Sequence, residues 1–200
     1  HDPSDTRMGI TLLLRPPAAL KQKISGFLHE TQRVAPKQYY YPETDLHVTV
    51  LSLISCYAGF ELQQINTEDY IKGVQHCLEG FSSFPIHFKG VALTETGVII
   101  QGFPMDKQLN ILRDKLRAYF KASDLQQSID SRYTLETAHS TVMRYCHTLE
   151  NKNAFINKME SFREFDFGSF EVKEMELVYN DWYQREANTT VLRKFKVLEA

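Results

Sequence analysis

The stretch that decides the fold reads Leu46-His47-Val48-Thr49-Val50-Leu51-Ser52-Leu53. Apolar and β-branched residues dominate it, which is typical of a buried β-strand. Successive side chains of a strand point to opposite faces, so His47 and Thr49 share one face while Val48 and Val50 share the other. The stretch therefore predicts a strand that presents an imidazole and a hydroxyl on one side.

The same His-x-Thr pattern recurs about ninety residues further on, at Ala138-His139-Ser140-Thr141-Val142-Met143-Arg144-Tyr145. His139 and Thr141 again stand two positions apart in a β-prone run, and so share a face. A lone His on a strand is more often structural than catalytic, and so short a motif arises by chance. Two such strands are much harder to explain by chance, and we expect them to build one site for a phosphate.

Helices and strands alternate around the two motifs. The apolar patterns predict helices after Pro17 and after capping residues Thr67, Asp106 and Thr148. They predict further strands over 9–14, 84–93, 98–100, 167–172, 175–179 and 191–197, with a hairpin turn at 94–97. This order predicts an α+β fold with two mainly antiparallel sheets flanked by helices.

The order of elements also repeats weakly along the chain. A motif strand, a helix and a pair of strands follow one another after His47, and again after His139. This suggests one bilobal, pseudo-twofold domain over residues 1–200, with a central groove between the motif strands. Residues 1–8 are polar and are expected to form a disordered lead-in, and residues 123–137 a polar, irregular connection.

Composition limits the classes of partner. A formal net charge of −2 gives the chain no global attraction to nucleic acid or to anionic membranes, so a nucleotide must be held locally. The three cysteines form no C-x-x-C pair, which favours free thiols in a reducing cytoplasm. No apolar run approaches the roughly 20 residues of a membrane span. We expect a cytoplasmic monomer that acts without a cofactor.

The paired motifs suit acid-base chemistry at a phosphoester. With an ordinary pKa near 6.5, histidine serves as either base or acid at neutral pH. One His from each motif strand can flank a phosphorus atom, and the hydroxyls of Thr49 and Thr141 can donate to its non-bridging oxygens. No His-x-x-x-His pair or Asp/Glu cluster accompanies either motif, so no metal site is predicted.

On these residues the chain resembles the two-histidine (2H) phosphoesterase superfamily, also called the 2′-5′ RNA ligase-like family, which includes cyclic nucleotide phosphodiesterases. The family's second motif commonly continues to an Arg, and Arg144 fits it. The resemblance implies a phosphodiesterase of RNA processing that hydrolyses 2′,3′-cyclic phosphates or 2′-5′ linked nucleotides without a metal. His47 and His139 would be catalytic, and Thr49 and Thr141 would bind the phosphate.

Two departures from the family pattern bear on the site. Ala138 stands where the family often has Pro before the second His. Arg144 is out of phase with His139 on a regular strand, so we expect it to face away from the groove unless a β-bulge re-aims it.

Aromatic residues are candidates to stack on a base, because stacking tolerates any base. Tyr145 is preferred because its face follows from the second motif. Tyr40 or Tyr41 before the first motif, and Trp182 or Tyr183 in a late loop, are the other candidates.

Three alternatives stay open at this point. Reversible 2′-5′ RNA ligation uses the same groups as hydrolysis, and a nucleotide-sensing module would keep the pocket without turnover. A structural protein with coincidental motifs predicts that His47 and His139 lie far apart. The sequence does not decide which His is the base, or which nucleotide or short oligonucleotide is bound.

Overall fold

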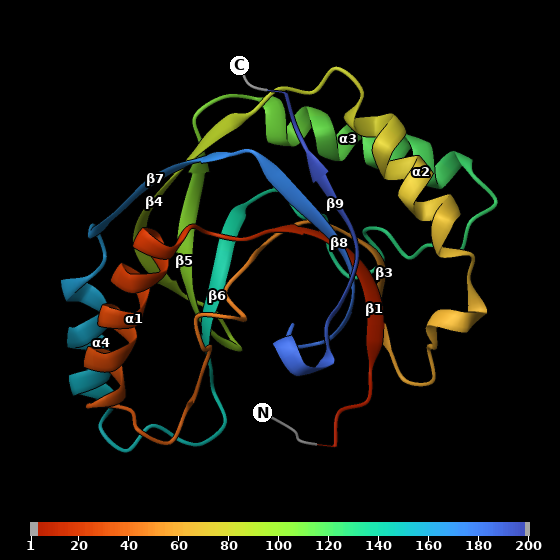
Figure 1. The fold of residues 1–200 in the computed structure, drawn as a ribbon. Coiled ribbons are helices and arrows are strands. Elements are labelled where there is room, and N and C mark those ends of the chain that lie inside the picture. The colour runs from red at the N-terminus through yellow and green to blue at the C-terminus, as the bar shows by residue number, and fades with distance from the viewer. Residues whose placement is uncertain (1–3, 199–200) are drawn as a thin grey trace.

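A computed structural model describes residues 4–198, and one of its two sheets contains the first motif strand. Its strand order is β3-β1-β8-β9, and all neighbours are antiparallel (Figure 1). The strands are β1 (Met8–Leu14), β3 (Val48–Tyr57), β8 (Glu174–Asp181) and β9 (Thr190–Lys196). The first motif strand therefore stands at the edge of its sheet, next to β1.

The second sheet contains the second motif strand and has the order β2-β6-β5-β4-β7, again antiparallel throughout. Its strands are β2 (Tyr39–Tyr40), β4 (Phe84–Leu93), β5 (Gly97–Pro104), β6 (Ala138–Arg144) and β7 (Asp166–Val172). Only the two-residue β2 lies outside the second motif strand, so β6 is also close to an edge.

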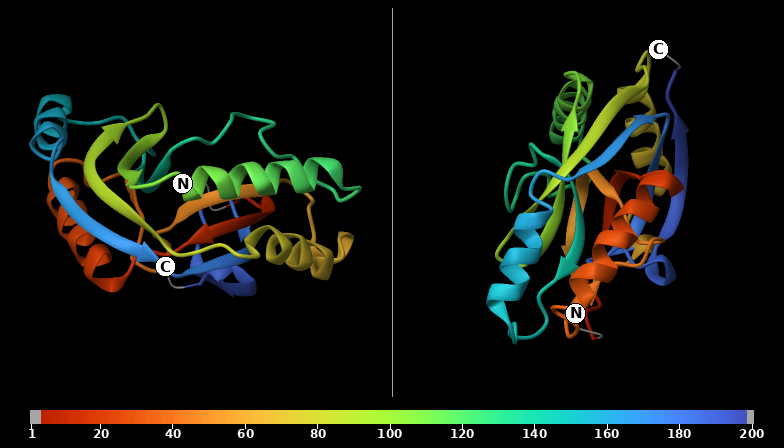
Figure 2. Two further views of the ribbon diagram at one scale, coloured as in Figure 1. Left: turned by 90° about the horizontal axis from the view of Figure 1, so that it is seen from above. Right: turned by 90° about the vertical axis from the view of Figure 1, so that its left-hand side faces the viewer.

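Each sheet is covered by two of the four α-helices of the described chain. Helices α1 (Ala18–Gln32) and α4 (Lys152–Ser161) lie together beside the second sheet, where α1 contacts β6 and β7. Helices α2 (Thr67–Leu78) and α3 (Gln108–Ala122) pack on each other and contact β9 and β3 of the first sheet. Figure 2 shows the two helix pairs at opposite ends of the molecule. Two short 3₁₀ helices, Leu62–Gln64 and Glu186–Asn188, lie in loops.

The predicted α+β class with antiparallel sheets is confirmed, and so is the hairpin at 94–97, which joins β4 to β5. Four strands, however, do not join the sheet of the motif they follow. The β4–β5 hairpin, which follows the first motif, joins the sheet of the second motif. Strands β8 and β9, which follow the second motif, join the sheet of the first. Each sheet is thus built from segments far apart in the chain.

In two helices the N-cap residue is an asparagine and not the predicted threonine. The helix expected to start at Thr67 is capped by Asn66, and the one expected at Thr148 begins later, after Asn151. Asn is among the best N-cap residues, because its short side chain reaches an unpaired N–H of the first turn. At α3 the N-cap position is Lys107, not the predicted Asp106, although the Asp106 carboxylate accepts from the Gln108 N–H at 2.8 Å.

The prediction of a disordered lead-in is wrong for residues 5–8, whereas residues 1–3 lie outside the described chain. Met8 already belongs to β1. Just before it, the Arg7 guanidinium donates to both carboxylate oxygens of Asp5, at 2.8 and 2.7 Å, and lies 4.7 Å from the Trp182 ring centroid. An ion pair and a cation–π contact hold this segment, and neither leaves an apolar pattern in the sequence.

The three cysteines, Cys56, Cys77 and Cys146, are all free. No helix of residues 4–198 combines the length and the apolar character needed to cross a bilayer.

Candidate functional site

A cavity of about 910 Å³ lies where β3 of one sheet approaches β6 of the other. His47, Thr49, His139 and Thr141 all line it. The reading as coincidental motifs predicts two distant histidines, whereas here both histidines and both threonines border one space. The alternation of β6 turns His139 and Thr141 toward that space, and the alternation of β3 does the same for Thr49.

The His47 side chain has a fixed orientation. It stands one residue before β3, not within the strand, and its Nδ1 lies 2.8 Å from the Asp45 carbonyl oxygen. A carbonyl only accepts, so Nδ1 carries the hydrogen of the neutral ring and Nε2 keeps a lone pair. Burial lowers the pKa of His47 to about 4, helped by the nearby charges of Arg15 and His139. At neutral pH this ring is an uncharged proton acceptor.

His139 has a different partner. Its Nδ1 lies 2.8 Å from the Thr137 hydroxyl, which can donate or accept. Burial lowers the pKa of His139 below its usual 6.5, and the charges of Arg113 and Arg144 lower it further. Thr137, His139 and Thr141 stand two positions apart, so the alternation that identified the motif could also have identified Thr137.

Arg144 faces the cavity, so the expectation that it points away is wrong. Met143 pairs with Val98 and Thr141 with Ile99, which leaves Val142 as an extra residue, a β-bulge. Val142 and Met143 are both fully buried, and Arg144 is thereby turned to the cavity side. There its Nη1 donates to the Thr96 hydroxyl at 2.7 Å, and its Nε to the Tyr41 hydroxyl at 3.4 Å.

The aromatic candidates are only partly brought to the cavity. Tyr145 lines it, as do Tyr41, Trp182 and Tyr183. Tyr40 does not, because its hydroxyl donates to the Ala35 carbonyl at 2.8 Å and its ring packs against the core. Of the two adjacent tyrosines before the first motif, Tyr41 therefore borders the site.

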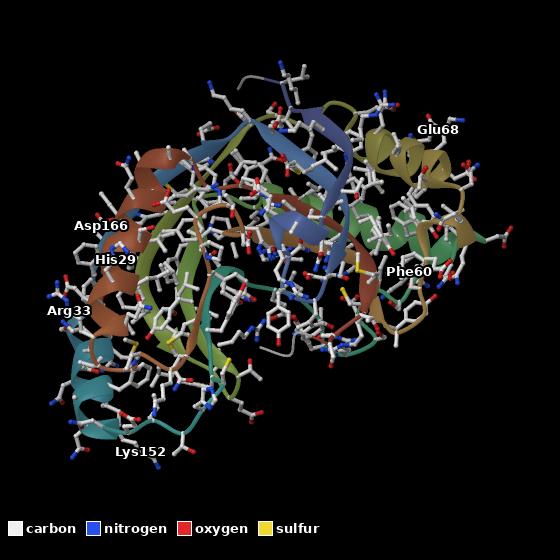
Figure 3. The ribbon with its side chains drawn as sticks, turned by 60° about the horizontal axis from the view of Figure 1, so that its bottom comes forward. His29, Arg33, Phe60, Glu68, Lys152 and Asp166 are labelled. Atoms are coloured by element: carbon white, nitrogen blue, oxygen red, sulfur yellow. The ribbon has the colours of Figure 1, made fainter. Side chains whose placement is uncertain are left out.

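Three of the other histidines lie away from the cavity. His29 is exposed on the outer side of α1 (Figure 3), and His76 is exposed on α2. The His87 Nε2 lies 3.0 Å from the carboxylate of Asp166, on the edge strand β7. None of these three lines the cavity.

A buried arginine of α3 joins the two motif segments, and the sequence interpretation missed it. The Arg113 guanidinium is fully buried and donates to four backbone carbonyls. Two belong to β3, Thr49 at 3.1 Å and Val50 at 2.8 Å. The other two precede β6, Glu136 at 3.0 Å and Thr137 at 2.9 Å. Burial lowers the pKa of Arg113 to about 10, so it stays charged at neutral pH.

One signal for Arg113 was present in the sequence. It lies on the apolar face of α3, beside the buried Leu109, Leu112 and Leu116. A charged residue on such a face has to find polar partners inside the protein. Its partners are backbone carbonyls distant in sequence, which no residue pattern identifies.

Within residues 4–198, no three His, Cys, Asp or Glu side chains gather as metal ligands.

Comparison with known proteins finds the fold but no close relative. No protein-family model and no curated protein sequence matches the chain. Among solved structures, Escherichia coli LigT complexed with 3′-AMP matches at 14% identity and a TM-score of 0.63, over 96% of this chain and 99% of that one. A structure described as a phosphoesterase matches at 15% identity and a TM-score of 0.65, over 96% of this chain and 99% of that one.

A protein of Thermus thermophilus matches at 16% identity and a TM-score of 0.65, over 97% of this chain and 99% of that one. LigT structures complexed with ATP and with NADP⁺ also match. The chain thus has the α+β fold of LigT over nearly its whole length. The resemblance to the 2H phosphoesterases, of which LigT is one, is confirmed at the level of the fold.

Proposed function

We propose that the protein is a metal-independent 2H-type phosphoesterase, which hydrolyses 2′,3′-cyclic phosphates or 2′-5′ linked nucleotides by acid-base catalysis at His47 and His139. One observation carries the proposal. Two His-x-Thr segments from different sheets border the same cavity, in a chain with the fold of LigT.

The two histidines divide the proton transfers. His47, with its Nε2 lone pair, takes a proton from a water molecule as the water oxygen bonds to phosphorus. The bond from phosphorus to the ribose oxygen breaks, and that oxygen receives a proton from the His139 imidazolium. The negative charge of a bound phosphate favours this protonated form of His139. The reaction leaves one phosphomonoester and one hydroxyl on the ribose.

Fixed donors stabilise the charge that develops on the phosphate. The hydroxyls of Thr49 and Thr141 face the cavity and can donate to the non-bridging oxygens. Arg144 brings a guanidinium to the same space and is held there by two hydroxyl partners rather than by a carboxylate. Its full charge is therefore available to the substrate.

Nucleotides are the proposed substrates for two reasons. LigT has been crystallised with 3′-AMP, ATP and NADP⁺, so that protein accommodates nucleotides. In this chain, Tyr41, Tyr145 and Tyr183 offer aromatic rings around the proposed phosphate position. Tyr145 remains the first candidate to stack on a base.

Replacing either catalytic histidine tests the proposal. H47A and H139A should each lower kcat by about 10²–10⁴-fold, because each removes one proton transfer. Turnover of a panel of 2′,3′-cyclic nucleotides and 2′-5′ dinucleotides is measured by chromatography, with circular dichroism to verify folding. H29A, which removes an exposed imidazole from α1, is the matched control and should retain wild-type rates.

Wild-type rates in both H47A and H139A would refute the catalytic assignment. Tight nucleotide binding by calorimetry without any product would favour the sensing module instead. Joined 2′-5′ products from cyclic phosphate and 5′-hydroxyl RNA ends would identify ligation, which runs the same proton transfers in reverse.

A further inference from the structure

Two guanidinium groups lie against the indole of Trp182. The Arg7 and Arg132 guanidinium carbons lie 4.7 and 4.6 Å from its ring centroid. Trp182 and Arg132 both line the cavity that contains the two histidines. Trp182 is thus engaged in cation–π contacts with two arginines, and one of these contacts fixes the position of Arg132.

The two arginines differ in their counterions. Asp5 neutralises Arg7 through two hydrogen bonds. Arg132 donates from Nη2 to the Cys56 carbonyl at 2.8 Å, and no carboxylate of residues 4–198 lies within ion-pair distance of it. Asp130, the nearest acidic residue along the chain, is engaged by two cations of α3. Arg132 thus brings an uncompensated positive charge to the cavity.

This charge lies far from the two motifs. Arg132 is bonded near the end of β3, whereas Thr49 is near its beginning. The neighbouring strand β1 pairs its Leu13 with Thr49 and its Met8 with Tyr57. Five residues of β1 cover this interval, which corresponds to roughly 16 Å at ~3.3 Å per residue. A single phosphate cannot contact both ends.

Three hydroxyl side chains line the cavity along β1 and β3. They belong to Thr11, Ser52 and Ser55. The volume of about 910 Å³ is near the upper end of the ~300–1,000 Å³ typical of small-molecule sites. The space therefore suits a ligand longer than one nucleotide.

We propose that Arg132, held against Trp182 and the Cys56 carbonyl, is a second phosphate-binding site that selects oligonucleotide substrates. The reacting phosphate lies between the histidines, and Arg132 binds another phosphate of the same strand. Stacked nucleotides at ~3.4 Å each cover the interval in about five units, and an extended strand covers it in fewer. This inference rests on the proposed function, since it places the reacting end at the His pair.

A substrate length series tests the second site. Oligonucleotides of one to about five units, each ending in a 2′,3′-cyclic phosphate, are compared by kcat/KM. For the wild type, kcat/KM should rise with length and level off once the strand reaches Arg132. The length ratio is kcat/KM for the longest substrate divided by kcat/KM for the shortest. R132Q should lower this ratio about tenfold, the scale of a charge-assisted bond to phosphate. R132K, which keeps the charge without the planar group, should retain part of the ratio.

The matched control is R193Q, which removes an exposed arginine of β9 outside the cavity and should leave the length profile unchanged. Salt provides a second readout. The dependence of log(kcat/KM) on log[salt] for the longest substrate should become shallower by about one unit in R132Q, because one phosphate contact is lost.

Two outcomes separate this inference from the proposed function. Turnover that is independent of length, or a length effect equal in R132Q and wild type, overturns the second site while leaving the phosphoesterase intact. If no substrate of any length is hydrolysed, the phosphoesterase proposal fails. Fluorescence anisotropy with 3′-phosphorylated oligonucleotides then decides the second site: R132Q-sensitive, length-dependent binding supports it, and binding equal in both proteins overturns it.

Discussion

The backbone at Asp45 decides which nitrogen of His47 can react. Its carbonyl only accepts, so Nδ1 is committed and Nε2 is left as the base. At His139 the partner is the Thr137 hydroxyl, which accepts from a ring whose Nδ1 carries a hydrogen and donates to a ring whose Nδ1 carries none. His139 can therefore release a proton from either nitrogen without losing this hydrogen bond. The His47 pKa of about 4 keeps that ring neutral, which supports His47 as the base and leaves His139 as the acid.

The pH dependence of kcat/KM follows from these two environments. The base must be neutral, so activity should fall as pH drops through the His47 pKa of about 4. The acid must be protonated, so activity should also fall as pH rises through the His139 pKa, which lies below 6.5. We expect a bell-shaped profile with its maximum on the acid side of pH 6.5, measured over about pH 3–9.

T137A is the matched variant for the pH profile. It removes the hydroxyl partner of His139 and should move the alkaline limb while leaving the acid limb in place. A kcat/KM that continues to rise up to about pH 8 would contradict His139 as the acid. The two limbs belong to a coupled pair, so the movement of a limb is more informative than its absolute position.

At the residue scale, the sequence predicted the shared phase of each His and Thr, because strand alternation is a local property. It did not predict which of Tyr40 and Tyr41 borders the cavity, since adjacent residues take opposite faces and β2 is only two residues long. Arg113 was missed because its partners are four carbonyls with no side-chain signature.

At the scale of single elements, the β-bulge in β6 determines which side chains of the second motif strand face the cavity. Val142 and Met143 are consecutive buried residues, where a regular strand would bury every second one. That apolar pair was visible in the sequence, but it does not reveal whether the strand bulges or is buried on both faces. The bulge explains why Arg144 joins the site although its spacing from His139 predicts the opposite.

A glycine of the neighbouring strand makes room for this bulge. A Cβ on Gly97 would lie 2.0 Å from the Met143 carbonyl oxygen, which is backbone and cannot rotate away. We expect G97A to lower the free energy of unfolding by about 1–3 kcal/mol, and to lower phosphoesterase activity because Arg144 pairs with Gly97. Urea denaturation and kcat/KM measure the two effects.

The same substitution in α1 is the control. Gly26 is exposed in the helix interior, and a Cβ there would meet nothing within 4 Å. G26A should therefore raise the free energy of unfolding, by about 0.5–1 kcal/mol, because alanine loses less backbone entropy in a helix. Equal effects of G97A and G26A would show that the contact with Met143 is unimportant.

At the scale of the whole molecule, Arg113 links β3 of one sheet to the segment that enters β6 of the other. R113K should lower the free energy of unfolding by about 2–4 kcal/mol, since an ammonium cannot serve four carbonyls and unpaired buried carbonyls cost about 1–3 kcal/mol each. Turnover should fall as well, because Thr49 and Thr137 belong to the segments that Arg113 joins.

R117K is the matched control for R113K. Arg117 lies one turn further along α3, and its partners are partly exposed carboxylates and the Leu135 carbonyl. Its replacement should cost about 1 kcal/mol or less. If R113K and R117K unfold at the same denaturant concentration, Arg113 does not hold the two sheets together.

The overall topology was only partly predictable. The class and the hairpin followed from local patterns, but the exchange of strands between sheets did not, because pairing over such separations depends on the three-dimensional fit of whole strands. The pairing of β1 with β8, for example, joins Met8 to Asp181, and no repeat or spacing in the sequence identifies that partner.

This pairing of β1 with β8 has a consequence for how the chain folds during its synthesis. Ribosomes make the chain from its N-terminus, so both histidines are synthesised before β8 and β9 exist. Until then β1 and β3 form only a two-stranded ribbon, which is marginal in water. The strand neighbours that complete the sheet at His47 arrive only with residues 174–196, so a nascent or prematurely terminated chain carries both motifs before the cavity between them can form.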